Sequence, residues 1–132
     1  MGLFDKIKEK AQQIKEENKN LGQTTKRMNN KENFFGFVNR GVDGGDFWKG
    51  SYVNFEAGRM QGSMVIYSAK EDDYWFSPSD VVSFEPAGTE KFMFASEMRE
   101  FPVFKIAFKD GKTARLDILS NKTEQFVKLV KG

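Results

Sequence analysis

The stretch that decides the fold is residues 104–119, Phe-Lys-Ile-Ala-Phe-Lys-Asp-Gly-Lys-Thr-Ala-Arg-Leu-Asp-Ile-Leu. Apolar and polar residues alternate on both sides of Asp110-Gly111, which is the pattern of two strands with one buried and one solvated face. Asp-Gly between two such runs is a preferred sequence for a two-residue type I′ turn. We therefore predict an antiparallel hairpin made of strands Val103–Lys109 and Lys112–Leu119.

The same alternation continues toward the N-terminus, in short runs separated by Gly, Pro, Asp and Ser. It predicts five further strands: Phe34–Arg40, Gly50–Glu56, Ser63–Ala69, Tyr74–Phe84 with a bend at Ser77-Pro78, and Lys91–Glu97. A turn at Pro86–Gly88 and a break at Glu100–Pro102 are expected around the last of these. On the other side of the hairpin, Asn121 is an N-cap residue, and apolar residues at helical spacing follow it, which predicts a helix over 121–131. Residues 33–132 are thus expected to form one mainly β (α+β) domain of seven antiparallel strands and a C-terminal helix.

Residues 1–21 have the pattern of a separate amphipathic helix. Its apolar residues recur every three or four positions, at Leu3, Phe4, Ile7, Ala11, Ile14 and Leu21. Gly22 is a typical helix-stop residue, and residues 22–32, which are almost free of apolar side chains, are expected to be a polar linker. Residues 1–31 hold eight Lys or Arg against four Asp or Glu, a net charge of +4, whereas the rest of the chain holds thirteen against fifteen, a net of −2. The positive charge therefore belongs to the N-terminal segment.

The composition excludes several kinds of chemistry. The 132 residues include no Cys and no His, which excludes disulfides, thiolate zinc sites and the commonest general base and metal ligand. No phosphate-binding loop or nucleophile elbow occurs, and the acidic loops 43–46 and 71–73 lack the spacing of a calcium loop. We therefore expect a non-enzymatic protein that uses no cofactor and no metal. Because the β domain is slightly acidic, we do not expect it to bind nucleic acid.

The element order of residues 33–132 resembles that of bacterial pleckstrin-homology-like (PH-like) and GRAM-like domains. The segments similar to theirs are Gly62–Ser68, then Tyr74–Glu85 with Pro78, Val81 and Phe84 on the pattern "pl-x-x-I-x-x-v", and Phe104–Lys112 before a helix. The resemblance implies a strongly bent seven-stranded barrel or sandwich that the C-terminal helix closes at one corner. It also implies a binding or adaptor module of bacterial or mobile-element origin. The basic cluster of the lipid-binding members is not matched, because the first hairpin region offers only Arg40 and Lys49, with Asp43 and Asp46 between them.

Three uses of the predicted N-terminal helix stay open. Its apolar stripe can pack on the β domain of the same chain. It can pair with a second copy or a partner helix, because Phe4, Ala11 and Asn18 fall at heptad position a, and Ile7, Ile14 and Leu21 at position d. It can also bind an anionic membrane surface, with Leu3, Phe4 and Ile7 in the interface and Lys6, Lys8 and Lys10 toward the headgroups.

For the β domain, the preferred hypothesis is recognition of a protein or peptide, with the N-terminal helix aiding pairing or recruitment. The residues predicted to form the partner patch are aromatic: Phe47, Trp48, Tyr52, Tyr74 and Trp75. The methionines at 60, 64, 93 and 98 are expected to fill the core or, alternatively, to form an adaptable binding face. The alternative function is a peripheral membrane module anchored by the N-terminal helix. No apolar run approaches the roughly 20 residues of a membrane span, so we expect a cytoplasmic protein, at the inner face of the membrane under this alternative.

Overall fold

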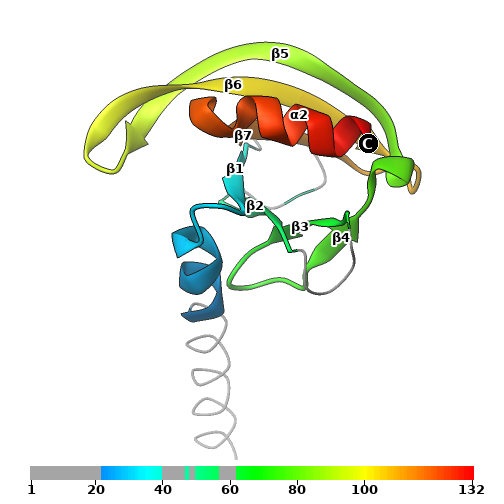
Figure 1. Cartoon of the computed structure of the whole chain (residues 1–132), viewed down its shortest axis with the longest axis horizontal. Coiled ribbons are helices and arrows are strands. Elements are labelled where there is room, and N and C mark those ends of the chain that lie inside the picture. The colour runs from blue at the N-terminus through cyan, green and yellow to red at the C-terminus, as the bar shows by residue number, and fades with distance from the viewer. Residues whose placement is uncertain (1–21, 40–46, 48–49, 57–61) are drawn as a thin grey trace, which may run out of the picture.

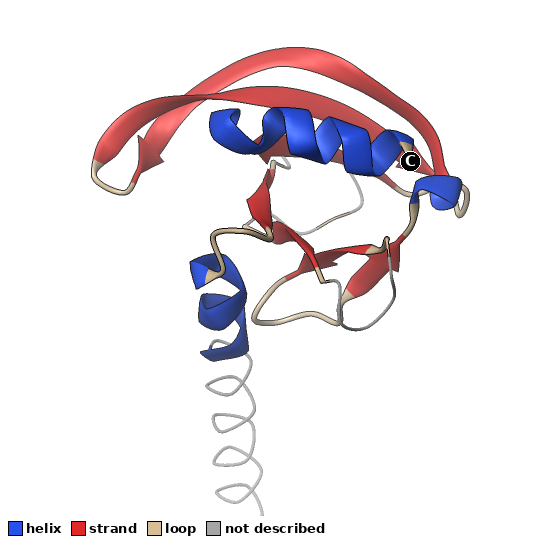
Figure 2. Cartoon of the chain, in the orientation of Figure 1, coloured by secondary structure: helices blue, strands red, loops and turns tan. Residues whose placement is uncertain are grey.

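The computed structural model describes residues 22–39, 47, 50–56 and 62–132. These residues form one seven-stranded antiparallel sheet and a C-terminal helix, α2 (Thr123–Lys131), which lies under the arch of the two longest strands (Figure 1). Figure 2 shows the same view by secondary structure, with α2 in blue below the red arch of the two longest strands. The prediction of a mainly β domain with seven antiparallel strands and a C-terminal helix is confirmed. The helix predicted over 1–21 lies outside the described residues.

The strands are β1 Phe34–Val38, β2 Tyr52–Phe55, β3 Met64–Tyr67, β4 Tyr74–Phe76, β5 Val81–Phe94, β6 Glu97–Phe108 and β7 Thr113–Ile118. Their order across the sheet is β4-β3-β2-β1-β7-β6-β5. The chain therefore forms two meanders, β1 to β4 and β5 to β7, which are joined by the pairing of β1 with β7. A 3-10 helix, η1 (Pro78–Asp80), connects the meanders in sequence, and a second, η2 (Ser120–Lys122), leads into α2.

Strands β5 and β6 are longer than the sequence predicts. The expected turn at Pro86–Gly88 lies inside β5, where the pairing register shifts and Gly88 has a φ of 97°. The expected break at Glu100–Pro102 lies inside β6, and Pro102 is tolerated because the pairing of β6 with β7 begins only at Val103. The bulge and the proline thus bend a continuous hairpin instead of ending its strands.

Two predicted strands therefore have wrong boundaries. The segment Tyr74–Phe84 is divided into β4, η1 and the start of β5, and the segment Lys91–Glu97 contains a turn at 95–96. Ala95 and Ser96 both have positive φ, 53° and 66°, and the residues on either side of them pair with each other. This is the two-residue hairpin geometry that normally selects Asn-Gly or Asp-Gly. Its unusual residues explain why the sequence pattern does not reveal it.

The hairpin predicted at Asp110-Gly111 exists, but its turn type differs from the prediction. The Gly111 N–H donates to the Phe108 carbonyl at 3.0 Å, and the Phe108 N–H donates to the Lys112 carbonyl at 2.9 Å. Of the turn residues only Gly111 has a positive φ, 90°, so this is a three-residue loop with glycine at the bulge position instead of type I′. Asp110 stabilises it by accepting a hydrogen bond from the Lys112 N–H at 3.0 Å.

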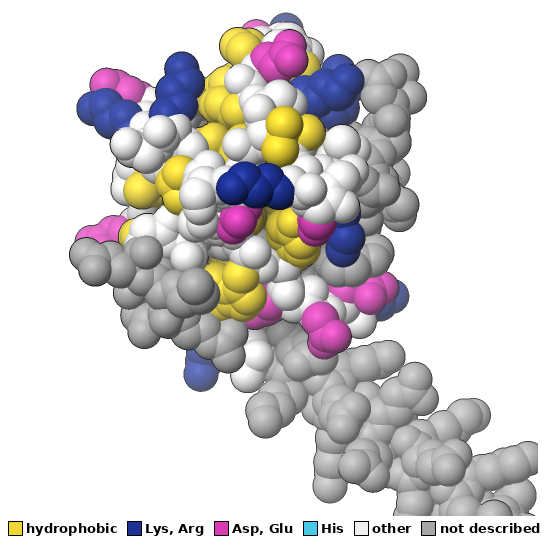
Figure 3. Space-filling model, turned by 90° about the vertical axis from the view of Figure 1, so that its right-hand side faces the viewer, with side chains coloured by type: hydrophobic (Ala, Val, Ile, Leu, Met, Phe, Trp, Pro, Cys, Tyr) yellow, Lys and Arg dark blue, Asp and Glu magenta, His cyan; other side chains and the backbone are white. Residues whose placement is uncertain are grey.

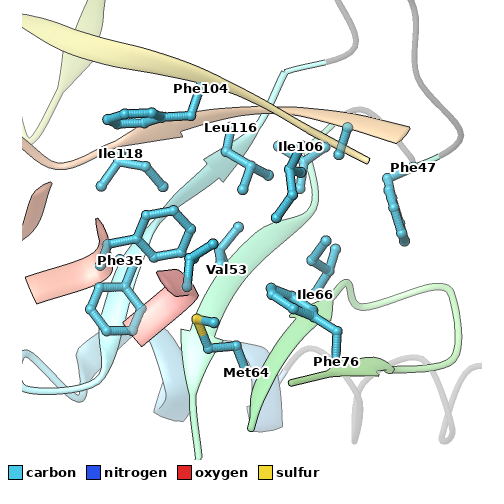
Figure 4. Packing of buried hydrophobic residues seen from close by; sticks show 14 of the residues in the cluster. Phe35, Phe47, Val53, Met64, Ile66, Phe76, Phe104, Ile106, Leu116 and Ile118 are labelled. Carbon is cyan, nitrogen blue, oxygen red and sulfur yellow. The ribbon is translucent and has the colours of Figure 1, made fainter. Parts of the chain in front are cut away.

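The inner face of the bent sheet carries the main core. Its buried side chains come from β1, β2, β3, β4, β6 and β7 and point into one shared space (Figure 4). Helix α2 covers this space with Phe126 and Val130. The Phe126 ring lies 5.4 Å from the Phe35 ring and 5.8 Å from the Phe84 ring, measured between centroids. The helix is therefore held by the same apolar stripe that predicts it.

The opposite face of the sheet carries a second group of rings, which we call the outer cluster: Phe34, Phe37, Tyr52, Phe92, Phe94 and Phe101. Phe37 is central, with ring centroids 5.3 Å from Phe94 and 5.6 Å from Phe92. Phe92 stacks on Phe101 at 4.0 Å, with the ring planes 6° apart. The distal half of the β5–β6 hairpin thus folds over the outer face of β1.

Gly36 makes the junction between the two meanders possible. A Cβ at this position would lie 2.1 Å from the backbone oxygen of Asp117 and 2.9 Å from the Cα of Ile118. Both atoms belong to the paired strand β7, so neither can move aside without breaking the β1–β7 pairing. The close approach of two backbones therefore requires glycine here.

Residues 22–29 are helical, where the sequence predicts a polar linker. Gly22 is the first described residue and is itself helical, and the helix predicted before it lies outside the described residues. The reason that residues 22–29 are helical is tertiary contact, because Thr24 is buried and Arg27 is held by groups that lie far away in the sequence. A segment with so few apolar residues does not signal such docking.

Arg27 joins this helical segment to the sheet. Its guanidinium donates two hydrogen bonds to the Asp73 carboxylate, at 2.9 and 2.7 Å, and also pairs with Glu56. The same group lies 4.7 Å from the centre of the Tyr67 ring. The hydrogen bonds to Asp73 raise the pKa of Arg27 further above its usual value. A planar, bidentate donor is suited to this combination of carboxylates and an aromatic face.

Candidate partner-binding surface

The aromatic residues predicted as a partner patch do not form one surface. Phe47 is buried in the main core, where its ring lies 4.8 Å from that of Tyr74. Tyr52 belongs to the outer cluster. Trp75 follows Tyr74 on β4 and therefore points to the opposite face of the sheet. The structure thus brings Phe47 and Tyr74 together and separates Tyr52 and Trp75 from them; Trp48 is outside the described residues.

The N-terminal residues predicted to contact a partner or a membrane are also outside the described residues. They are Leu3, Phe4, Ile7, Ala11, Ile14, Leu21, Lys6, Lys8 and Lys10. Among the four methionines considered above, Met64 is buried in the main core and Met60 is not described. Met93 and Met98 remain as surface residues.

Met93 and Met98 lie directly opposite each other on β5 and β6, next to the hairpin tip. Their side chains are 60% and 63% exposed. The tip itself extends past the N-terminal end of α2 in Figure 1. Paired, solvent-exposed apolar side chains on a projecting element are typical of contact surfaces, and methionine adapts its shape to the surface that it meets.

A groove of about 490 Å³ lies next to this tip, and we call it the tip groove. Its described lining residues are Met28, Asn29, Lys31, Phe34, Phe94, Ala95, Arg99, Leu119, Asn121 and Lys122. They come from the end of helical residues 22–29, the start of β1, the β5–β6 tip and the η2 segment. The described lining therefore combines four large apolar side chains with three cations and contains no Asp or Glu.

Several contacts fix the walls of the tip groove. The Lys122 ammonium donates to the backbone carbonyl of Glu32 at 3.2 Å, which ties η2 to the segment before β1. The Leu119 N–H donates to the Phe35 carbonyl at 2.8 Å. On the opposite wall the Arg99 guanidinium lies 5.5 Å from the centre of the Phe94 ring. These contacts hold apolar and cationic groups at the same concave surface.

A second hollow, of about 320 Å³, lies where helical residues 22–29 meet the β3–β4 connection, and we call it the helix pocket. Its described lining is polar: Gln23, Thr24, Arg27, Ser68, Lys70, Glu71, Asp72 and Asp73. The guanidinium in this pocket is already paired with Asp73 and Glu56. The helix pocket therefore offers neither an apolar floor nor an unpaired guanidinium.

A buried and a half-buried carboxyl group lie close together on the outer face, at the level where the hairpin folds over β1. Asp117 of β7 is 4% exposed, and its carboxylate accepts from the Asn39 amide at 3.5 Å. The same amide donates to Glu90 of β5. Burial and the neighbouring charge of Glu90 raise the pKa of Asp117 to about 7, while Asn39 and Arg115 act in the opposite direction. The alternation of residues 104–119 predicts a solvated polar face, and this prediction is wrong at Asp117, because β5 covers this part of the sheet.

The described residues contain no cluster of metal-binding side chains. Among residues 22–39, 47, 50–56 and 62–132, no group of three or more carboxylates is placed to hold a metal ion. No helix in the described part of the chain is both long and apolar enough to cross a membrane. The side of the molecule where α2 ends carries Lys, Arg, Asp and Glu interspersed with apolar side chains (Figure 3). This side therefore presents mixed charges and no continuous basic surface.

No protein-family model matches the chain, and no curated protein or solved structure is significantly similar to it. The arrangement of side chains is therefore the basis for any functional assignment. Sequence reasoning did not identify the residues of the tip groove. Its lining residues come from four separate segments, and no local pattern reveals that these segments meet. Met93 and Met98, which the sequence analysis names, lie at the same hairpin tip but not in the lining.

Proposed function

We propose that this protein is a non-enzymatic binding module that recognises a protein or peptide partner at the tip of the β5–β6 hairpin. The observation that carries the proposal is the tip groove, a concave surface whose described lining combines apolar side chains with cations. The exposed residues Met93 and Met98 lie at the same hairpin tip, but alternation along the strands puts them on the other face of the hairpin from Phe94 and Arg99. A pocket with mainly apolar walls and a few convergent polar groups is the usual form of a binding site. The apolar groups supply affinity, and the cations supply selectivity.

The proposal includes a PH-like fold. The strand order β4-β3-β2-β1-β7-β6-β5 and the placement of α2 against the inner face support it. In that fold a strongly bent sheet is closed at one corner by a C-terminal helix. The site proposed here lies at a hairpin tip and depends on the local side chains, since fold alone does not define function.

Selection from a random peptide display library on the immobilised full-length chain tests this function. We expect enrichment of a recognisable peptide family whose binding is lost in Met28→Lys, which places a charge in the groove lining. The matched control is Val82→Lys, because it adds the same charge at an apolar residue that is 67% exposed and lies near the base of β5, outside the lining. Failure to enrich any family, or equal loss of binding in the control, would contradict the proposal.

A second candidate function, a peripheral membrane module, is favoured by one sequence observation. The segment Gly2–Lys10 has bulky apolar residues with lysines at the margins, as interfacial helices do. Co-sedimentation of the full chain with anionic vesicles tests it, with Leu3→Glu, Phe4→Glu and Ile7→Glu combined as the variant. Pelleting of the parent chain and not of the variant would support the membrane function. If both stay in the supernatant, this candidate is excluded.

The proposed pairing role of the N-terminal helix is tested by the mass of the full chain in solution. A dimer that becomes a monomer after Ile7→Glu and Ile14→Glu would support pairing through heptad position d. A monomer before and after the substitutions would remove the pairing role and leave peptide recognition unaffected.

A further inference from the structure

The two hollows of the described chain differ in the state of their charged groups. In the helix pocket, Arg27 is neutralised by two carboxylates. In the tip groove, neither Lys31 nor Lys122 pairs with a carboxylate of the described residues, and the Lys122 ammonium donates a hydrogen bond to the Glu32 backbone carbonyl. The groove therefore has two ammonium groups beside apolar side chains and no acidic residue in its described lining. A ligand that carries carboxylates would complement these charges.

We propose that the tip groove binds an acidic peptide segment that places a bulky apolar side chain on the groove floor and carboxylates beside Lys31 and Lys122. This inference rests on the proposed function and names its ligand class. By the floor we mean the large apolar side chains of the lining, which are Met28, Phe34, Phe94 and Leu119. These side chains match an aromatic or branched aliphatic anchor. The anchor displaces water from the floor, and ion pairs at its margin are strengthened as the local dielectric constant falls.

The third cation, Arg99, has a different role. Its guanidinium lies over the Phe94 ring and 3.3 Å from the Glu97 carboxylate, so its charge is partly compensated. It forms a wall of the groove and keeps Phe94 in place. Lys31 and Lys122 act as point charges that bind the carboxylates of the ligand, since an ammonium group can donate to a carboxylate from many directions.

The position of these cations favours a peptide over a membrane surface. Glu97 and Glu100 stand on the same hairpin tip, and both are exposed. A planar anionic surface that reached the groove cations would also meet these carboxylates. A narrow peptide can enter the groove and avoid them. The volume of about 490 Å³ also lies within the roughly 300–1,000 Å³ typical of pockets that enclose a small ligand.

Fluorescence anisotropy with the full-length chain tests the inference. The probe is a fluorescein-labelled hexapeptide with Phe-Leu in the centre and two Glu on each side. One comparison peptide replaces the Glu residues by Gln, and another replaces Phe-Leu by Ser-Ser. We expect the acidic peptide with Phe-Leu to bind at least tenfold more tightly than either comparison peptide, and its affinity to fall when salt is raised.

Two charge-reversal variants distinguish an effect of the groove cations on binding from an effect of the net charge of the protein. Lys31→Glu combined with Lys122→Glu is expected to weaken binding of the acidic peptide at least tenfold. The matched control, Lys105→Glu combined with Lys109→Glu, changes the net charge equally at exposed positions outside the groove lining and is expected to stay within twofold of the parent. Urea midpoints of both variants show whether each is folded before binding is compared.

Three outcomes would overturn the inference. The first is equal affinity for the Glu and Gln peptides, and the second is equal loss in the groove variant and the control. The third is binding to phosphatidylglycerol vesicles that requires Lys31 and Lys122, with no binding of any peptide, which would assign the groove to lipid. A display selection that enriches non-acidic peptides whose binding is lost in Met28→Lys would leave the proposed function standing and remove only the acidic ligand class.

Discussion

The two faces of the sheet use similar aromatic residues in different surroundings. On the inner face, Phe35 and Phe126 pack among aliphatic side chains that are almost completely buried. On the outer face, Phe37 and Phe92 lie near ionisable groups, among them Asp117 and Glu90. The inner face is covered by one amphipathic helix, α2. The outer face is covered at one end by helical residues 22–29 and at the other by a bent hairpin.

This difference shows which face provides stability and which face offers a binding surface. Burial of apolar area is the main source of folding free energy, and the inner face supplies most of it. The outer face contains buried polar groups, which cost free energy unless they are paired. Its two covers meet at the tip groove, where apolar and cationic groups remain accessible. The outer face, which mixes apolar and polar side chains, is thus the face that carries the proposed site.

The largest expected effect tests the inner face. Phe126→Ala removes the ring that contacts Phe35, Phe84 and Phe104, and it should lower the free energy of unfolding by about 3–5 kcal/mol. Phe92→Ala, on the half-buried outer cluster, should cost only about 1–2 kcal/mol. Urea denaturation followed by far-UV circular dichroism measures both. Equal losses would mean that the two faces contribute equally to stability.

The next effect concerns the carboxyl pair on the outer face. Because the pKa of Asp117 is raised to about 7 in the folded state, the folded protein holds a proton that the unfolded chain loses near pH 4. The contribution of this group to stability therefore decreases as the pH rises from about 4 to about 7. Asp117→Asn removes the titrating group and should raise the free energy of unfolding at pH 8 by ~2 kcal/mol, with little change at pH 4.

Urea midpoints of the parent and Asp117→Asn at several pH values between 4 and 8 check this prediction. Glu90→Gln serves as the companion variant, because it removes the neighbouring charge and keeps a similar shape. If the stability curves of parent and Asp117→Asn run parallel across this range, the carboxyl pair does not titrate as described.

A smaller effect is expected where helical residues 22–29 cover the outer face. Arg27→Ala removes the bidentate contact with Asp73 and the pair with Glu56, and it should cost about 1–2 kcal/mol. Amide hydrogen exchange should accelerate over 24–28 more than over β6. Arg27→Lys keeps the charge without the planar donor pair and should restore only part of the protection. Uniform acceleration over the whole chain would contradict local docking.

The smallest effect concerns the hairpin tip, where the strain is local. Ala95 and Ser96 have positive φ angles that favour Asn and Gly. Ala95→Asn combined with Ser96→Gly should therefore raise the free energy of unfolding by about 1 kcal/mol. Thermal and urea denaturation measure this gain. A loss of stability would show that the tip does not adopt the two-residue turn.

Much of the fold could be predicted from local patterns. Alternation identified β1, β2, β3 and β7 within a few residues, and the apolar stripe with Phe126 identified α2. Predictions failed where pairing between distant segments overrode local chemistry. Pro86 and Pro102 lie inside strands because each faces an unpaired position or a bulge of the long hairpin. The turn at Ala95 and Ser96 went unnoticed because neither residue is a usual turn former.

The candidate site was less predictable than the fold. The predicted aromatic patch placed Phe47 and Tyr52 on one surface, whereas the structure places Phe47 in the inner core and Tyr52 in the outer cluster. Residues on one strand reveal their face through a period of two, but residues from different strands share a face only when register is known. The tip groove combines Lys31, Phe94 and Lys122, and no sequence spacing connects them.

The amino-acid order thus determines a β-rich chain with a C-terminal amphipathic helix, and it excludes cysteine and histidine chemistry. These properties depend on composition and short-range periodicity, which act before any long-range contact forms. Tertiary structure decides that β1 pairs with β7, that the long hairpin folds over the outer face, and that Asp117 is buried. It also creates the tip groove. Each of these features depends on contacts between distant residues, whose free energy is gained only when the whole sheet is formed.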